Sequence, residues 1–239
     1  AFTPGGGKAL MGSAAYLDPY CGPAPVPETL LLRWNFDPLL MVALAGLALA
    51  IWSWGRADRI GRLSGSGAVV LLVIAFISPL CALASALFSA RVGHHLILIA
   101  AAAPLLAITF PMRRQPALPL SLVLIVHTVL VWLWHAPAPY QAALESDAVY
   151  WLMQASLLGS AYLLWRGVLD RRTGSGAGLM TLLATVMQMG LLGALLVFAP
   201  EPLYVAHLFS TFAFGLSPQS DQQLAGILMW VPAVLPYLG

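Results

Sequence analysis

The chain has 239 residues, of which 60% are hydrophobic and only 8% are charged, and its mean hydropathy is +0.87. Average soluble domains carry about 25% charged residues, so this composition excludes an ordinary soluble protein and indicates an integral membrane protein. The formal net charge of +2 is close to neutral and argues against nucleic acid as a partner.

Seven stretches are apolar and long enough to cross a bilayer, whose hydrocarbon layer of about 30 Å takes roughly 20 helical residues. In chain order they cover residues 37–55, 68–88, 92–110, 117–135, 148–167, 178–199 and 222–239. Backbone polar groups in lipid must be paired internally, and the sequence has no strand-like alternation. We therefore expect an all-α integral membrane protein, a bundle of seven transmembrane helices.

Small and cyclic residues within these stretches predict local geometry. Pro79, Pro104 and Pro232 are expected to kink or end helical turns. Gly190 and Ala194 are small enough to permit close approach of a neighbouring helix.

The two ends of the chain differ in composition. Residues 1–36 are rich in glycine and proline and contain no long apolar run, so we expect a periplasmic N-terminal segment without a signal peptide. Residues 37–239 form the expected transmembrane domain. The last apolar stretch stops abruptly at Gly239, which suggests that the sequence is truncated there.

Orientation is predicted from the arginines, because cationic loops stay on the cytoplasmic side of a membrane. Eight of the eleven cationic residues fall in three short loops, and most acidic residues fall on the other side. These eight are Arg56, Arg59, Arg62, Arg113, Arg114, Arg166, Arg171 and Arg172. We therefore expect a multi-pass protein of the bacterial inner membrane with its N-terminus in the periplasm.

Potential soft-metal ligands gather in the outer half of the expected bundle. The candidates are His94, His95, His127, His135, Cys21, Cys81, Met153 and Met187. Imidazole, thiol and thioether groups with few carboxylates favour Cu(I) over calcium or magnesium. His207 falls in an outer loop and is expected at the surface.

The position of each candidate ligand along its helix indicates whether it has a functional or a structural role. His127 lies deep in the bilayer, where an ionisable group is costly and marks a functional site facing the bundle interior. Methionine commonly fills gaps in apolar cores, so packing is an open alternative for Met153 and Met187. On a helix, the adjacent His94 and His95 point about 100° apart, and Met187 and Met189 point about 200° apart. We therefore expect one member of each pair to face inward.

The two cysteines do not resemble a framework disulfide. Cys21 lies in an extended, proline-rich segment, whereas Cys81 is expected about 10 Å below the outer end of the helix over residues 68–88. A thiol on this oxidising face is expected either to contact metal transiently or to stay unpaired.

Several sequence strings together resemble one family from Arg33 to the end of the chain. They are Arg33–Pro38, Ser78–Leu80, Leu87–Ala90, Trp134–Pro137 with Tyr140, Gly190–Leu196, Phe198–Pro200, Pro202–Tyr204, Gly215–Pro218, Asp221–Gly226 and Met229–Pro232. In these strings the chain is similar to the CtaG family of cytochrome c oxidase assembly factors, of the caa3 type. The string at residues 221–232 is the most specific.

The resemblance implies maturation of a haem-copper oxidase by copper handling on the outer face of the membrane. It also implies seven helices, and it matches His95 and His135 to histidines of the family's motifs. Arg91 and Val92 stand where many relatives have histidine and methionine, and Gln154 stands where they have histidine. No nucleotide-binding or hydrolase motif is present, so we do not expect an enzyme.

The hypothesis from the sequence is that Cu(I) binds to two or three of His95, His127, Met153, Met187 and Cys81. Cys21 or His135 is the expected first contact for the incoming ion, and the expected partner is an oxidase subunit in the same membrane. Three alternatives stay open: a b-type haem protein ligated by His95 and His127, a copper or proton transporter, and a structural subunit of a respiratory complex. The oligomeric state is not predicted.

Overall fold

The computed structural model of the protein describes residues 19–110 and 118–238. Every regular element in these two ranges is a helix, and no strand occurs in them, which confirms the all-helical fold. Arg113 and Arg114, two of the loop arginines used to predict orientation, lie outside the described residues.

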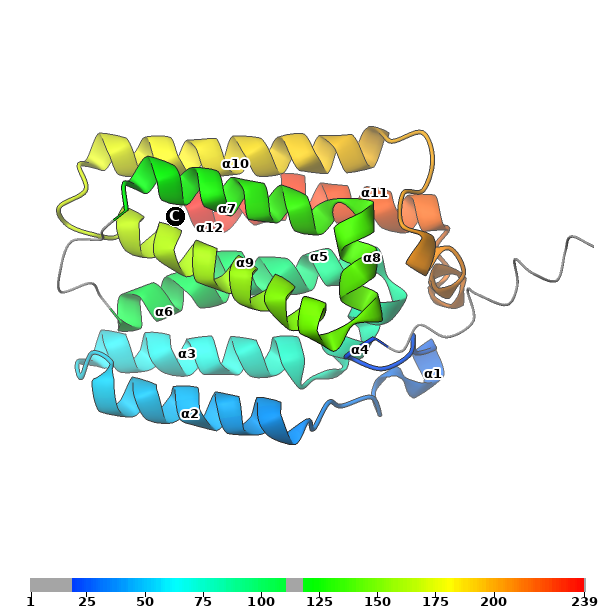
Figure 1. The fold of residues 1–239 in the computed structure, drawn as a ribbon, viewed down its shortest axis with the longest axis horizontal. Coiled ribbons are helices and arrows are strands. Elements are labelled where there is room, and N and C mark those ends of the chain that lie inside the picture. Colours follow the sequence, from blue (N-terminus) through cyan, green and yellow to red (C-terminus); the bar gives the residue numbers. More distant parts are fainter. Residues whose placement is uncertain (1–18, 111–117, 239) are drawn as a thin grey trace, which may run out of the picture.

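The long helices lie side by side with their axes roughly along one direction (Figure 1). They are α2 (Pro38–Trp54), α3 (Arg59–Phe76), α7 (Leu120–His135), α9 (Asp147–Val168), α10 (Ser175–Phe198) and α11 (Pro218–Trp230). Helix α5 (Phe88–Leu96), the π-helical η1 (Ile97–Ala102) and α6 (Ala103–Thr109) follow one another without a break and form a further rod.

The remaining helices are short. Most of them lie at one end of the bundle, and the last two form the C-terminal end of the described chain (Figure 1). They are α1 (Pro27–Leu30), α4 (Pro79–Ala86), α8 (Pro137–Glu145), η2 (Val205–His207), η3 (Ser210–Phe214), η4 (Pro232–Val234) and α12 (Leu235–Leu238).

Three of the described helical segments are long and apolar enough to span a bilayer: α3, the rod Phe88–Thr109, and α10. A fourth is obtained if α7 and α8, which meet at a 72° bend, count as one span. These helices indicate a membrane protein with three or four candidate spans. The seven-span topology and the outward N-terminus stay predictions.

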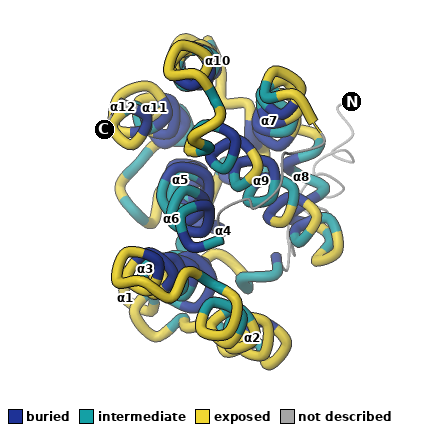
Figure 2. Tube along the Cα trace, turned by 90° about the vertical axis from the view of Figure 1, so that its left-hand side faces the viewer, coloured by how far each residue is buried: buried dark blue, intermediate teal, exposed yellow. Residues whose placement is uncertain are grey.

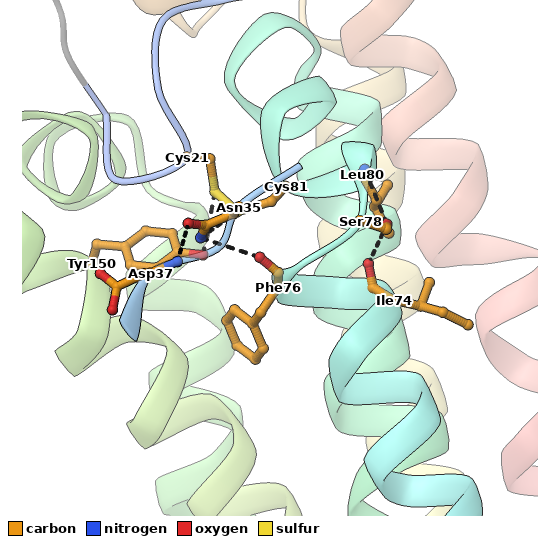
Figure 3. The surroundings of a disulfide bond; sticks show 9 residues. All are labelled: Cys21, Asn35, Asp37, Ile74, Phe76, Ser78, Leu80, Cys81 and Tyr150. Carbon is orange, nitrogen blue, oxygen red and sulfur yellow. Dashed lines mark hydrogen bonds between the residues drawn. A yellow bond between two sulfur atoms is a disulfide. The ribbon is translucent and has the colours of Figure 1, made fainter. Parts of the chain in front are cut away.

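The stretch 68–88, expected as one helix, is broken. Helix α3 begins at Arg59 and ends at Phe76, and α4 begins at Pro79. Ser78 caps α4 by accepting a hydrogen bond from the Leu80 N–H at 3.2 Å, and Pro79 occupies its first turn (Figure 3). Serine followed by proline favours the start of a new helix, so Cys81 lies on α4 and not within the preceding span.

The last predicted helix, 222–239, is also shorter than expected. Helix α11 already begins at Pro218, behind the Ser217 cap, and ends at Trp230. Proline at position 232 cannot supply the N–H that would continue the helix, and the chain proceeds as the short η4 and α12.

The rod formed by α5, η1 and α6 occupies the centre of the bundle. It contacts α3, α9 and α11, and the end-on view shows it in dark blue and teal, with buried and intermediate residues and no exposed ones (Figure 2). Six of the nine residues of α5 are buried, among them Arg91, His94 and His95. The peripheral helices α2 and α10 instead expose leucine, valine and tryptophan side chains. Polar groups inside and apolar groups outside are the arrangement expected in lipid.

Candidate metal centre

The start of α5 is fixed by a buried carboxylate on α11. Asp221 accepts hydrogen bonds from the backbone N–H groups of Phe88 at 2.7 Å and Ser89 at 3.2 Å, and from the Ser89 hydroxyl. The first N–H groups of a helix lack partners within it and favour a negative charge. Asp221 thus holds the helix that carries Arg91, His94 and His95.

His95 on α5 faces His135 at the end of α7. The centroids of the two imidazole rings are 5.3 Å apart, and the ring planes are inclined by 82°. Both side chains are buried, with exposures of 1% and 4%. Because a metal–imidazole bond is about 2 Å long, the spacing of the two rings is compatible with one ion between them.

The hydrogen bonds of the pair leave three of its four ring nitrogens free. His135 Nδ1 donates to the Val131 carbonyl at 2.6 Å, which leaves Nε2 as the lone-pair nitrogen of the neutral ring. Nε2 of His135 and both nitrogens of His95 have no partner among the described residues. A bond from one ring nitrogen to a carbonyl is the arrangement that orients a metal-binding histidine.

His94 is also buried, which corrects an expectation from the sequence. It is 0% exposed, its ring lies 5.0 Å from that of Phe76 and 5.9 Å from that of His95, and neither nitrogen has a described partner. The expectation that only one of His94 and His95 faces the interior is wrong because α5 is the central helix. A helix surrounded on all sides has no lipid-facing side.

His127 faces the interior as predicted but lies apart from the pair. It is 0% exposed, and its Nδ1 is 2.9 Å from the Ser160 hydroxyl on α9, while Nε2 has no described partner. Eight residues of helix place it about 12 Å along α7 from His135. The two recorded ring neighbours of His95 among the histidines are His94 and His135, not His127.

The methionines divide between core and surface. Met153 on α9 is 0% exposed and belongs to the main hydrophobic core. Of the two on α10, Met189 is 1% exposed and Met187 is 73% exposed. One of them faces inward, as expected from the helical angle, but it is Met189, so Met187 is removed from the candidate ligands.

His207 is not the surface residue that its loop position suggested. It lies on η2, is 2% exposed, and both of its nitrogens are bonded: Nδ1 donates to the Ala86 carbonyl at 3.1 Å, and Nε2 accepts from the Tyr140 hydroxyl at 2.7 Å. Burial lowers the pKa of His207 to about 4. The residue joins the loop before α11 to α4 and α8 and has a structural role.

The two cysteines form a disulfide, which overturns the expectation of an unpaired thiol. The Cα atoms of Cys21 and Cys81 are 5.3 Å apart across a sequence separation of 60 residues (Figure 3). The N-terminal segment folds back over the bundle: the ring of Tyr20 stacks on that of Tyr150 at 4.9 Å, and the Tyr150 hydroxyl donates to Cys21 Sγ at 3.6 Å. A disulfide offers no thiolate, so Cys21 and Cys81 are not ligands while it is intact.

The described residues contain no group of three or more histidine, cysteine or acidic side chains that could hold a metal ion. The available centre is therefore the His95–His135 pair, with His94 beside it. Sequence reasoning gave these residues. It named Asp221 only as part of a string that resembles the family and did not predict that Asp221 anchors the start of α5.

Fold and site together define a class: a helical membrane protein whose central helix carries an internal imidazole cluster. The sequence model of one family, cytochrome c oxidase caa3 assembly factor (Caa3_CtaG), matches residues 48–239, which is most of the chain. The chain belongs to this family. The match includes all the buried histidines and leaves out Cys21. Comparison with curated proteins and with solved structures gave no match.

Proposed function

We propose that the protein is a membrane-embedded assembly factor that binds one Cu(I) ion between His95 and His135 and passes it to a haem-copper cytochrome c oxidase. Membership of the family supports the role in oxidase assembly. The observation that carries the copper proposal is the pair of buried rings, 5.3 Å apart, with three nitrogens that have no described partner.

The chemistry of the pair suits a transferable Cu(I) ion. Imidazole is a suitable copper ligand, and buried polar atoms without hydrogen bonds are rare in native proteins. Two protein ligands hold the ion less firmly than a closed site of four, so a ligand from the acceptor can join and displace them. His94, the nearest further imidazole, is available as a third ligand during the exchange.

The distribution of arginines supports transfer on the periplasmic side. Arg56, Arg59 and Arg62 lie at the α2–α3 connection, and Arg166, Arg171 and Arg172 lie around the α9–α10 connection. Both connections are at the opposite end of the bundle from α4 and α8, where His135 lies (Figure 1). The positive-inside rule then puts the histidine pair in the outer half of a bacterial inner membrane, with the N-terminal segment outside.

Metal analysis of purified variants tests the proposal. We expect wild-type protein loaded with Cu(I) in ascorbate to retain about one copper per chain by mass spectrometry, and His95→Ala and His135→Ala to retain much less. His127→Ala is the matched control, because it removes a buried imidazole outside the pair. The same comparison is repeated in a Cys21→Ser/Cys81→Ser background, so that opened thiols cannot account for the bound copper.

Equal copper retention in the His95, His135 and His127 variants contradicts the proposed pair. The transfer step is tested separately by capture of the copper-loaded protein with its oxidase. Transient, copper-dependent capture supports an assembly factor, whereas recovery at a fixed stoichiometry independent of copper indicates a structural subunit.

A further inference from the structure

A buried guanidinium group lies without a partner in the centre of the bundle. Arg91 on α5 is 0% exposed, and Nε, Nη1 and Nη2 have no hydrogen-bond partner in the described part of the chain. The single ion pair found among the described residues, Arg56 with Asp58, lies elsewhere. The Arg91 guanidinium lies over the ring of Tyr150, whose centroid is 5.3 Å away, and near the hydroxyl groups of Tyr140 and Tyr150.

The protein cannot relieve this buried charge by releasing a proton, because arginine keeps its charge under all ordinary conditions. The face of Tyr150 offsets part of the cost through a cation–π contact but leaves the N–H donors unused. Removing a cation from water without a counter-charge is among the most expensive changes in a protein interior. A negatively charged ligand would neutralise the guanidinium and accept hydrogen bonds from its N–H groups.

Among the described residues, no carboxylate forms an ion pair with Arg91. The buried acid that holds the start of α5, Asp221, accepts three hydrogen bonds from Phe88 and Ser89 instead. The Arg91 guanidinium therefore has no counter-charge in direct contact within the described part of the chain.

The neighbours of Arg91 supply more unused donors. Gln154 lies one helical turn beyond Tyr150 on α9, so both side chains are on the same face of that helix. Gln154 is 2% exposed, and neither its amide nitrogen nor its amide oxygen has a described partner. His94, three residues after Arg91 on α5, also has two unpartnered nitrogens. Two adjoining helices thus present unpaired polar groups around one fixed positive charge.

We propose that Arg91 and Gln154 form an internal binding site for a small monovalent anion of the size of chloride or formate. The guanidinium supplies the charge and its N–H fork, and the Gln154 amide supplies further N–H donors. One guanidinium neutralises a single negative charge, whereas a phosphate-bearing ligand brings more charge than that. Anion binding at this site does not require copper, so a test of the site is independent of the test of the proposed function.

Thermal unfolding of the purified, copper-free protein in detergent tests the site. Unfolding is followed in sodium chloride, sodium bromide and sodium gluconate at equal ionic strength, gluconate being too large for the site. A ligand that binds the folded state at about ten times its Kd raises the unfolding midpoint of a chain of this size by about 3–6 °C. We expect chloride and bromide to give a saturating rise over gluconate.

Arg91→Gln is expected to abolish the difference between the salts, and Gln154→Leu to weaken it. The control, Arg33→Gln, removes an exposed guanidinium that donates to the Pro23 carbonyl, and it is expected to keep the wild-type response. Equal midpoints for the wild type in all three salts overturn the proposal.

Bromide diffraction gives a second readout that needs no variant to fold. Crystals of the wild-type protein grown in bromide are expected to show an anomalous peak beside the Arg91 guanidinium. Bromide peaks confined to the protein surface, with none beside Arg91, contradict the site.

Discussion

Opening the Cys21–Cys81 disulfide is expected to destabilise the protein and to release its N-terminal segment. The bond closes a loop with a sequence separation of 60 residues. In the chain-entropy model, a loop of this length corresponds to about 4 kcal/mol of stability. For a chain of this size that is a fall in the unfolding midpoint of roughly 8–16 °C. The figure is an upper bound here, because apolar helices that stay in detergent micelles restrict the unfolded chain as well.

Two measurements on Cys21→Ser/Cys81→Ser and wild-type protein check this expectation. Thermal unfolding gives the change in midpoint, and limited proteolysis reports whether the segment around Tyr20 and Arg33 detaches from α4 and α9. We expect a lower midpoint and new cleavage between residues 21 and 36. An unchanged midpoint together with an unchanged cleavage pattern refutes the reasoning. The packing of Tyr20 on Tyr150 would then hold the segment in place without the disulfide.

Three further predictions concern the packing of the helices. Asp221→Asn replaces the carboxylate that accepts the N–H groups at the start of α5 with a neutral amide. We expect the free energy of unfolding, measured with denaturant, to fall by about 2 kcal/mol, and an unchanged value would contradict the anchoring role. His207 has a folded pKa lowered to about 4, below its unfolded value of about 6.5, so its contribution to stability is present above pH 6.5 and is lost as the pH falls toward 4. Wild type is therefore expected to lose about 2 kcal/mol more than His207→Gln between pH 7 and pH 5, and parallel curves contradict this. A Cβ at Gly193 meets the Gly226 carbonyl at 2.6 Å, whereas one at Gly190 meets nothing closer than 3.7 Å, so Gly193→Ala is expected to lower the unfolding midpoint clearly and Gly190→Ala hardly at all.

Much of the helical fold could be predicted from the sequence, because apolar length and arginine-rich loops mark helices directly. Helix α2 was expected at 37–55 and is found at Pro38–Trp54, and α9 was expected at 148–167 and is found at Asp147–Val168. Pro79 was expected to kink or end a helical turn, and the chain does break there. The start of a separate helix was not predicted, because the stretch stays apolar on both sides of Ser78. Only the cap and the proline mark the new helix.

Features that depend on how the helices pack were harder to predict from the sequence. Hydropathy does not say which helix is central, so only one of His94 and His95 was expected to face inward. Arg91 was seen only as a departure from the family's motif. Gly190 was expected to permit close approach, and a Cβ there lies 3.7 Å from Trp230 on α11. The tightest approach of α10 to α11 is instead at Gly193 and Gly226, because helix rotation is set by packing against neighbouring helices.

The pairing of distant residues was the hardest to predict. His135 was expected only as a first contact for copper, and His127 as a ligand, because depth in the bilayer was the available guide. In the structure His95 faces His135. Cys21 and Cys81 likewise meet through a fold of the N-terminal segment that leaves no periodic signal in the sequence.

X-ray absorption at the copper edge tests the central claim most directly. The sample is Cu(I)-loaded Cys21→Ser/Cys81→Ser protein, in which the histidine pair is intact and no cysteine competes. The account predicts a low-coordinate Cu(I) ion with two imidazole nitrogens at about 2 Å, a signature that His135→Ala reduces to one ring or abolishes. A spectrum without imidazole scattering, or one that is unchanged in His135→Ala, contradicts copper binding between His95 and His135.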